Sequence, residues 1–201
     1  MKLNTEKELR ELYGFAKGRA VSKELDAFEQ HSVRYIELSP FVVISSVGHN
    51  GDLDSSPRGG VPGFAKVLNK HTLLLPDSKG NNRLDSLVNI IETAKLGCLF
   101  MIPGVNETLR VNGHASITTR DDYLALFSAE RNSPKSVIEV KVTSIYLHCA
   151  KAFMRSKLWS TDAITDREKL PTMSQMINDQ TEGESVIETQ QMMEQRYQKE
   201  L

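Results

Sequence analysis

Cysteines and long apolar runs are scarce in this sequence. Only two cysteines, Cys98 and Cys149, occur among its 201 residues. Two thiols do not make the disulfide framework of a small secreted domain, so a cytoplasmic location is expected. No stretch stays apolar for long enough to cross a bilayer, and residues 1–8 contain no apolar signal core. We therefore expect no association with a membrane.

An excess of positive charge is also missing. Lysine and arginine together number 25, against 26 acidic residues, so the formal net charge is −1. Proteins that bind nucleic acid through its phosphate backbone usually carry a basic excess. The composition therefore does not favour a nucleic-acid partner.

Sequence motifs for metal binding and nucleophilic catalysis are missing as well. No histidine stands at metal-ligand spacing from a second histidine or a cysteine pair. His148 and Cys149 are adjacent, and neighbours on a strand face opposite ways, so joint ligation is not expected. As a nucleophile pair they would need a third residue to orient them, and none is visible. Residues 59–63 lack the Lys-Ser/Thr ending of a phosphate-binding loop.

The sequence does contain many short apolar segments separated by turns. Hydrophobic residues make up 39% of the chain, which is typical of a globular protein. Short turns and few interposed helices favour antiparallel over parallel pairing. We predict a mainly β (α+β) fold, a small closed or nearly closed antiparallel barrel. Six segments are predicted strands: Phe41–Val47, Leu53–Arg58, Thr72–Leu75, Lys95–Ile102, Glu107–Thr119 and Ser136–Leu147.

Helical segments are predicted on both sides of this barrel, so the chain divides into residues 1–38, 39–160 and 161–201. Helices are expected at Glu6–Tyr13 and Ser22–Gln30, the latter with Leu25 and Phe28 on one face. In the last part, capping-box patterns begin at Thr172 and Ser185. The second would open a helix with one apolar stripe, formed by Val186, Met193, Tyr197 and Leu201. An amphipathic arm without a partner in its own chain predicts a dimer contact.

The turn after the third predicted strand carries the first functional signal. Asn81 and Asn82 are good N-cap residues, and Arg83 would begin the helix. A cation in the first helical turn is mildly unfavourable, unless an anion lies in front of it. The turn is therefore either an anion site or an ordinary surface turn. The helix itself is predicted from an apolar stripe: Leu84, Leu87, Val88 and Ile91.

Four stretches, in this order, resemble the flavin-binding split-barrel family related to pyridoxamine 5′-phosphate oxidase. The likeness covers residues 30 to 160 and is closest to a branch of short flavoproteins. It implies a six-stranded antiparallel split barrel and a homodimer with two FMN molecules at the subunit interface. The stretches are Ser56–Gly59, Gly80–Leu87, Thr108–Gly113 and Arg155–Trp159.

The resemblance also implies the cofactor contacts. Asn81, Asn82 and Arg83 fall where the family binds the FMN phosphate. The residues that fall beside the flavin ring or phosphate are Ser55, Ser56, Arg58, Thr108 and Arg110. The residues in the segment that can reach the partner subunit's flavin are Lys151, Arg155 and Trp159.

The chemistry of a flavin agrees with these residue types. Its phosphate needs cations, and a positive charge near the ring edge tunes its potential. Arg58 and Arg110 are the candidates for that charge, or they form surface salt bridges with Glu107, Asp54 or Glu139. The first hypothesis is an FMN-dependent oxidoreductase acting on a small molecule. A flavin- or haem-binding carrier or sensor, and a deazaflavin-dependent reductase, stay open.

Overall fold

One antiparallel sheet forms the body of the protein. The computed structural model describes residues 2–129, 132–181, 183 and 187–199. Within them, seven strands pair in the order β2-β1-β5-β6-β7-β4-β3, and every pair is antiparallel. The strands are β1 (Phe41–Val47), β2 (Leu53–Gly59), β3 (Lys66–Asn69), β4 (Thr72–Asp77), β5 (Lys95–Met101), β6 (Thr108–Thr118) and β7 (Ser136–His148).

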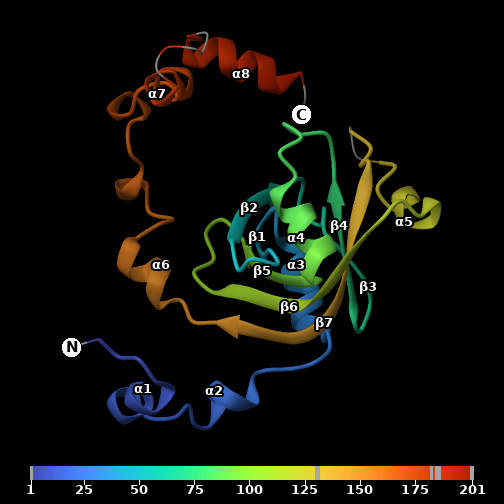
Figure 1. The fold of residues 1–201 in the computed structure, drawn as a ribbon, viewed down its shortest axis with the longest axis vertical. Coiled ribbons are helices and arrows are strands. Elements are labelled where there is room, and N and C mark those ends of the chain that lie inside the picture. Colours follow the sequence, from blue (N-terminus) through green and yellow to red (C-terminus); the bar gives the residue numbers. More distant parts are fainter. Residues whose placement is uncertain (1, 130–131, 182, 184–186, 200–201) are drawn as a thin grey trace.

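The predicted six strands are all present, and β3 is the strand that the sequence analysis missed. The sheet curls into a split barrel with helices around it, which confirms the α+β prediction (Figure 1). Its ends are β2 and β3, which are not paired to each other. Strand β3 is short, and it holds two half-buried and two exposed residues. Its sequence therefore lacks the clear alternation by which the other strands are recognised.

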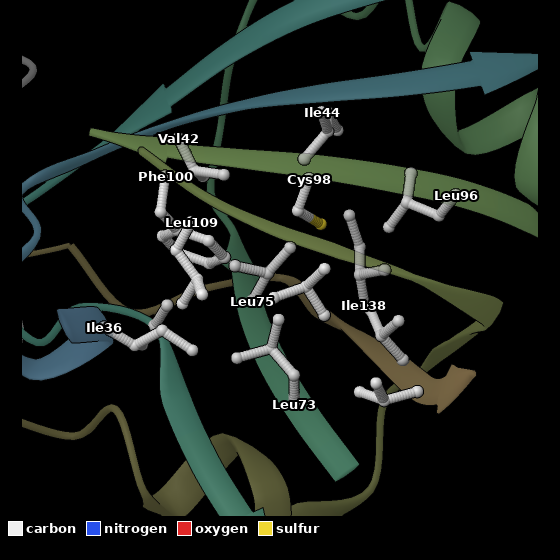
Figure 2. Close-up of a cluster of buried hydrophobic side chains, with 14 of the residues drawn as sticks. Ile36, Val42, Ile44, Leu73, Leu75, Leu96, Cys98, Phe100, Leu109 and Ile138 are labelled. Atoms are coloured by element: carbon white, nitrogen blue, oxygen red, sulfur yellow. The ribbon is translucent and has the colours of Figure 1, made fainter. Parts of the chain in front are cut away.

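The inward-facing side chains of the strands form the main core (Figure 2). Val42 and Ile44 of β1 are fully buried, while their neighbours along the strand are more exposed. Such alternation is expected for a sheet with one buried face. Cys98 lies inside this core, and burial raises the pKa of its thiol to about 12. It is thus the buried free thiol that its apolar surroundings indicate.

Two strands differ from each other in the number of faces that they bury. Strand β5 is apolar along most of its length, but only alternate residues are buried. Strand β4 instead buries Leu73, Leu74 and Leu75 in succession. Leu74 points away from the main core and belongs to a second apolar cluster, with Tyr123, Phe127 and Val137. The segment around α5 (Asp121–Ala125) therefore covers the outer face of β4.

Helix α4 (Asp85–Thr93) covers strands β1, β2, β5 and β6, while α3 (Gln30–Leu38) contacts β3 and α5 contacts β7. No helix in the described part of the chain is long and apolar enough to traverse a lipid bilayer. The α-helices are α1 (Glu6–Tyr13), α2 (Arg19–Ser22), α3 (Gln30–Leu38), α4 (Asp85–Thr93), α5 (Asp121–Ala125), α6 (Lys151–Ser156), α7 (Met173–Gln180) and α8 (Gln190–Gln198). Two 3₁₀ turns, η1 (Thr161–Ala163) and η2 (Arg167–Lys169), lie between α6 and α7.

The helix predicted at Ser22–Gln30 is wrong. Leu25 forms an isolated bridge with Ile145 of β7, through two main-chain hydrogen bonds of 2.9 and 2.7 Å. This pairing competes with a helix because it uses the same N–H and C=O groups. Phe28 is buried, whereas Leu25 is 42% exposed, so the two do not share a buried face. The helix that does form, α3, begins after its cap, Glu29.

The C-terminal arm extends away from the barrel as a small helical unit (Figure 1). Thr172 caps α7 as predicted, accepting a hydrogen bond from the Gln175 N–H. The second predicted cap, Ser185, lies outside the described residues, as do Val186 and Leu201. Helix α8 begins only at Gln190 and is capped by Thr189. Among the described residues of this stretch, 187–189 are not helical, and Thr189 accepts a hydrogen bond from the Met192 N–H as the cap of α8.

Candidate functional site

The candidate site is a pocket of about 1070 Å³ at the split of the barrel. We call it the seam pocket. Its walls come from β2, from the end of β4 and the turn after it, from the start of α4, and from the segment before β7. Strand β2 is an edge strand, so no further strand fills the space beyond its free edge. The pocket exists because the sheet does not close there.

Five of the eleven cofactor residues predicted from the sequence line the seam pocket: Ser56, Arg58, Asn81, Asn82 and Arg83. Ser55 precedes Ser56 on β2 and therefore points to the opposite face of the sheet, where it is exposed. The remaining predicted residues do not line the pocket; they are Thr108, Arg110, Lys151, Arg155 and Trp159.

Arg58 is held by polar partners at the inner end of the pocket. Its Nη1 donates to the Ser56 hydroxyl at 2.5 Å and to the Pro57 carbonyl at 3.0 Å. Its Nη2 lies 3.5 Å from Asp77 Oδ1, and both side chains are largely buried. Burial raises the pKa of Asp77, although the Arg58 guanidinium partly opposes this. The surface salt bridges predicted for Arg58 are thus replaced by a half-buried pair with Asp77.

The turn before α4 has an unusual backbone. Asn82 and Leu84 both have positive φ, at 59° and 60°. The Arg83 N–H donates to Asn81 Oδ1 at 3.1 Å, which ties the turn together. Asn81 and Asn82 are therefore not N-caps, and Arg83 does not begin the helix, because Leu84 is the cap residue. No side chain of the described residues caps α4, so its first N–H groups keep their capacity to bind an anion.

The chain's own carboxylates lie beside this helix start. Arg83 Nε is 2.5 Å from Asp85 Oδ2, in a pair whose side chains are 78% and 45% exposed. This contact raises the pKa of Arg83. The Ser86 hydroxyl donates to Asp54 Oδ2. The pocket therefore combines positive and negative groups rather than positive charge alone.

Five charged residues that sequence reasoning did not select as site residues also line the pocket: Asp54, Asp77, Lys79, Asp85 and Lys135. Asp77 and Lys79 lie in or next to the turn after the third predicted strand. Their charge was the signal from which they could have been selected. Lys135 is far away in sequence, and the antiparallel pairing of β4 with β7 brings it there. Its N–H donates to the Asp77 carbonyl at 2.9 Å. In all, four basic and three acidic side chains line the pocket: Arg58, Lys79, Arg83 and Lys135, with Asp54, Asp77 and Asp85.

Comparison with known proteins now gives the family. The family model described as pyridoxamine 5′-phosphate oxidase matches residues 28–149, which include the whole barrel and most of the seam pocket's surroundings. The chain belongs to the pyridoxamine 5′-phosphate oxidase family. No curated protein matches the sequence.

Solved structures that are similar to this chain include the following three proteins. HupZ from Group A Streptococcus is 16% identical, with a TM-score of 0.51, over 60% of this chain and 93% of that one. A putative pyridoxamine 5′-phosphate oxidase from Lactobacillus delbrueckii is 18% identical, with a TM-score of 0.48, over 62% and 98%. An FAD binding protein from Mycobacterium smegmatis is 14% identical, with a TM-score of 0.43, over 62% and 97%. At such identities the likeness to HupZ shows a shared fold and no more.

Two residues predicted beside the flavin ring lie on β6, outside the seam pocket of this oxidase-family barrel. Thr108 is only 3% exposed. Arg110 is exposed and donates from Nη1 to the Tyr146 hydroxyl at 3.2 Å. Its predicted salt-bridge partner Glu139 pairs with Lys141 instead. Within one chain, β6 therefore presents Arg110 to a different surface from the one that holds Arg58.

The segment after the oxidase-family barrel holds the last three predicted residues. Trp159 donates from Nε1 to the Val105 carbonyl at 2.9 Å and stacks on Phe153, with ring centroids 5.5 Å apart. Lys151 and Arg155 lie on α6 and are exposed. None of the three approaches the seam pocket of its own chain. No cluster of His, Cys, Asp and Glu in the described residues could hold a metal ion.

The seam pocket fits the phosphate end of a flavin nucleotide. A phosphate requires N–H groups and cations, and the uncapped start of α4 lies beside Arg83 and Lys79 in the pocket wall. An aromatic ring requires an apolar surface, and Phe64, Pro76 and Leu87 line the same pocket. Both requirements are met by residues that face one space.

Proposed function

We propose that the protein is an FMN-dependent oxidoreductase that binds its cofactor in the seam pocket and acts on a small molecule. The observation that carries the proposal is the uncapped start of α4, which lines a pocket of about 1070 Å³ together with four basic side chains. Membership of the pyridoxamine 5′-phosphate oxidase family supports it. When bound, FMN would supply the hydride or electron transfer, and the protein would supply binding and orientation.

In this proposal the turn before α4 binds the phosphate. Arg83 would exchange its exposed contact with Asp85 for a bidentate contact with phosphate oxygens. Such an exposed pair contributes little to stability, so the exchange costs little. The N–H groups at the start of α4 would donate to the remaining oxygens, and Lys79 would add a second cation. Ser56 and Arg58 would face the cofactor from β2.

The decisive test is the visible absorption spectrum after addition of FMN. Arg83→Glu is expected to weaken FMN binding at least about tenfold, because a charge-assisted contact is lost and a repulsive one is gained. Titration of bound FMN by fluorescence or absorbance measures this. The matched control is Arg120→Glu, because Arg120 forms a similarly exposed pair with Asp122 and lies outside the pocket. A variant at Arg83 that binds FMN as well as wild type does would refute the phosphate assignment.

Two further experiments separate the enzyme from the other candidates. A carrier or sensor would accept electrons without returning them to a substrate, whereas an oxidoreductase should show reoxidation that depends on an acceptor. Release of the native cofactor and its mass spectrum would distinguish FMN from a deazaflavin or haem. The oxidoreductase proposal fails if no acceptor reoxidises the reduced protein faster than buffer does.

We also propose a homodimer that uses the C-terminal arm. Large apolar side chains of this arm are exposed, among them Ile164 at 76% and Ile187 at 59%. The apolar stripe from which α4 was predicted is exposed at Leu84, Val88 and Ile91, because Ser86 and Ile90 face the barrel. Apolar surfaces of this kind are typical of subunit contacts. Lys151, Arg155 and Trp159, which lie away from their own pocket, would then approach the partner's cofactor.

Deletion of residues 161–201 is expected to convert the dimer into a monomer. The reason is that the arm removes its exposed apolar side chains from water only in the dimer. Light scattering after size-exclusion chromatography measures the mass of both proteins over a range of concentrations. Far-UV circular dichroism serves as the control that the barrel still folds. A truncated protein that remains dimeric would assign the contact to another surface.

A further inference from the structure

The seam pair, Arg58 and Asp77, differs from the other ion pair of the seam pocket in its burial. The side chains of the seam pair are 23% and 15% exposed. Those of Arg83 and Asp85 are 78% and 45% exposed. Exposed pairs exchange partners readily, because water and salt screen them. A ligand anion that approaches Arg58 also approaches the Asp77 carboxylate. Water screens the charge of Asp77 less than that of the more exposed Asp85.

The surroundings of Asp77 indicate that its charge is only partly compensated. The Arg58 guanidinium faces the Asp77 carboxylate from β2. The main-chain N–H of Lys135 donates to the main-chain carbonyl of Asp77 and not to its carboxylate. Burial raises the pKa of the Asp77 carboxyl more than Arg58 lowers it. The pair therefore costs some of the stability that an apolar contact would give. A carboxylate kept at this cost in a pocket wall points to a role in ligand binding.

The geometry also determines what Asp77 would do to a bound phosphate. Arg58 has its Nη1 engaged with Ser56 and Pro57, so Nη2 is the side of the fork that faces Asp77. A ligand oxygen that approaches Nη2 on this side meets Asp77 Oδ1, which lies 3.5 Å from the same nitrogen. It would then share the pocket with a largely buried negative charge. Two negative charges this close repel each other, and the repulsion is stronger where the charges are more buried.

We propose that Asp77 is a specificity-determining residue that competes with the ligand's phosphate for Arg58. The identity of that ligand as FMN rests on the proposed function, whereas the competition itself concerns any phosphate in the seam pocket. Asp77 lowers the advantage that a phosphorylated ligand has over its uncharged parent. It thereby selects ligands that gain enough contact elsewhere in the pocket to compensate for the repulsion.

The test compares Asp77→Asn with wild type, using FMN, riboflavin and inorganic phosphate as three separate probes. Asparagine keeps the size of the side chain and removes its charge. We expect FMN and inorganic phosphate to bind about tenfold more tightly to this variant, because one repulsive contact is removed. Riboflavin carries no phosphate, and its affinity should change less than about twofold. Asp77→Ser is a second variant that also removes the charge, in case the first folds poorly.

Two control variants make the comparison specific. Asp85→Asn removes the exposed carboxylate of the other pocket pair, and its gain in FMN affinity should stay below about threefold. Asp122→Asn removes an exposed carboxylate outside the pocket and should leave FMN binding as in wild type. Thermal unfolding followed by circular dichroism shows whether each variant is folded before its affinity is compared.

The outcomes separate this inference from the proposed function. If wild type binds FMN and Asp77→Asn binds it no more tightly, the competition is refuted and the cofactor proposal stands. If FMN binds neither protein but inorganic phosphate binds Asp77→Asn more tightly, the competition stands and FMN is the wrong ligand. If neither probe binds either protein, both proposals fail. An equal gain for riboflavin and FMN would also refute the competition, because it would not depend on the phosphate.

Discussion

Replacement of Arg58 by glutamate is expected to reduce FMN affinity at least about 100-fold and to destabilise the fold by about 2 kcal/mol. Arg58 is the one basic residue of the described pocket wall with a largely buried ion pair. Reversal of its charge would bring two carboxyl groups together at the inner end of the pocket, beside Asp77. Equilibrium denaturation with urea measures the stability, and FMN titration measures the affinity.

The dependence of this destabilisation on pH gives a second measurement. Two facing carboxyl groups raise each other's pKa, so the folded variant binds protons more tightly than the unfolded chain does. The contribution of these two groups to stability is therefore most favourable at low pH and is lost as the pH rises through their raised pKa values. The deficit relative to wild type should therefore shrink when the pH is lowered from 7 towards 4. A deficit that stays constant would show that lost packing, rather than charge, is the cause.

The control for this variant is Arg34→Glu. Arg34 lies on α3, is 65% exposed at its side chain, and pairs with Glu37 within its own helix. Exposed pairs of this kind contribute about 0–1 kcal/mol, so we expect a small loss of stability and no change in FMN affinity. If both variants behaved alike, the burial of Arg58 would be irrelevant to its role.

The strands could be predicted from the sequence because their side chains point alternately into the barrel core and away from it. Strand β6 was expected at Glu107–Thr119 and is found at Thr108–Thr118. Strand β7 was expected at Ser136–Leu147 and extends one residue further. In both, β-branched and apolar residues recur with a period of two, and pairing with two neighbours buries one face. Local pattern and tertiary structure agree there.

The buried faces of the helices were harder to predict, because contacts with residues far away in the sequence decide which face is buried. The apolar stripe of α4 predicted the helix correctly, but most of this stripe is exposed in the structure. Ser86 is buried and bonded to Asp54, and Ile90 packs in the core, while Ile91 is 76% exposed. A stripe of apolar residues can serve a subunit contact as well as a core. Sequence periodicity cannot distinguish these two environments.

The candidate site was predictable only where its residues are close together in sequence. Asn81, Asn82 and Arg83 form one turn, so residue type and position were enough to select them. The partnership of Arg58 with Asp77 depends on how β2 approaches the end of β4 across the split. Lys135 reaches the pocket through the pairing of β4 with β7. No local signal encodes either of these approaches.

A close approach between β6 and β7 makes Gly113 the glycine most sensitive to substitution. The register of the two strands shifts between Asn112 and Gly113, and Thr143 of β7 has no residue opposite it in this register. A Cβ on Gly113 would collide with the main-chain oxygen of Lys141 and lie 2.9 Å from its carbonyl carbon. Because these atoms belong to the backbone, they cannot move aside without separating the strands. The shift in register therefore requires a residue without a Cβ at position 113.

Gly113→Ala is accordingly expected to lower the free energy of unfolding by about 3 kcal/mol, at the upper end of the cost of overpacking. For a chain of this size, the melting temperature should fall by about 6–12 °C. Gly80→Ala is the control, because a Cβ added there would meet no atom within 4 Å and its φ is not in the left-handed region. Its free energy of unfolding should change by less than about 0.5 kcal/mol. A decrease in the free energy of unfolding of less than about 1 kcal/mol for Gly113→Ala would contradict this expectation. It would mean that β6 and β7 can move apart locally at little cost.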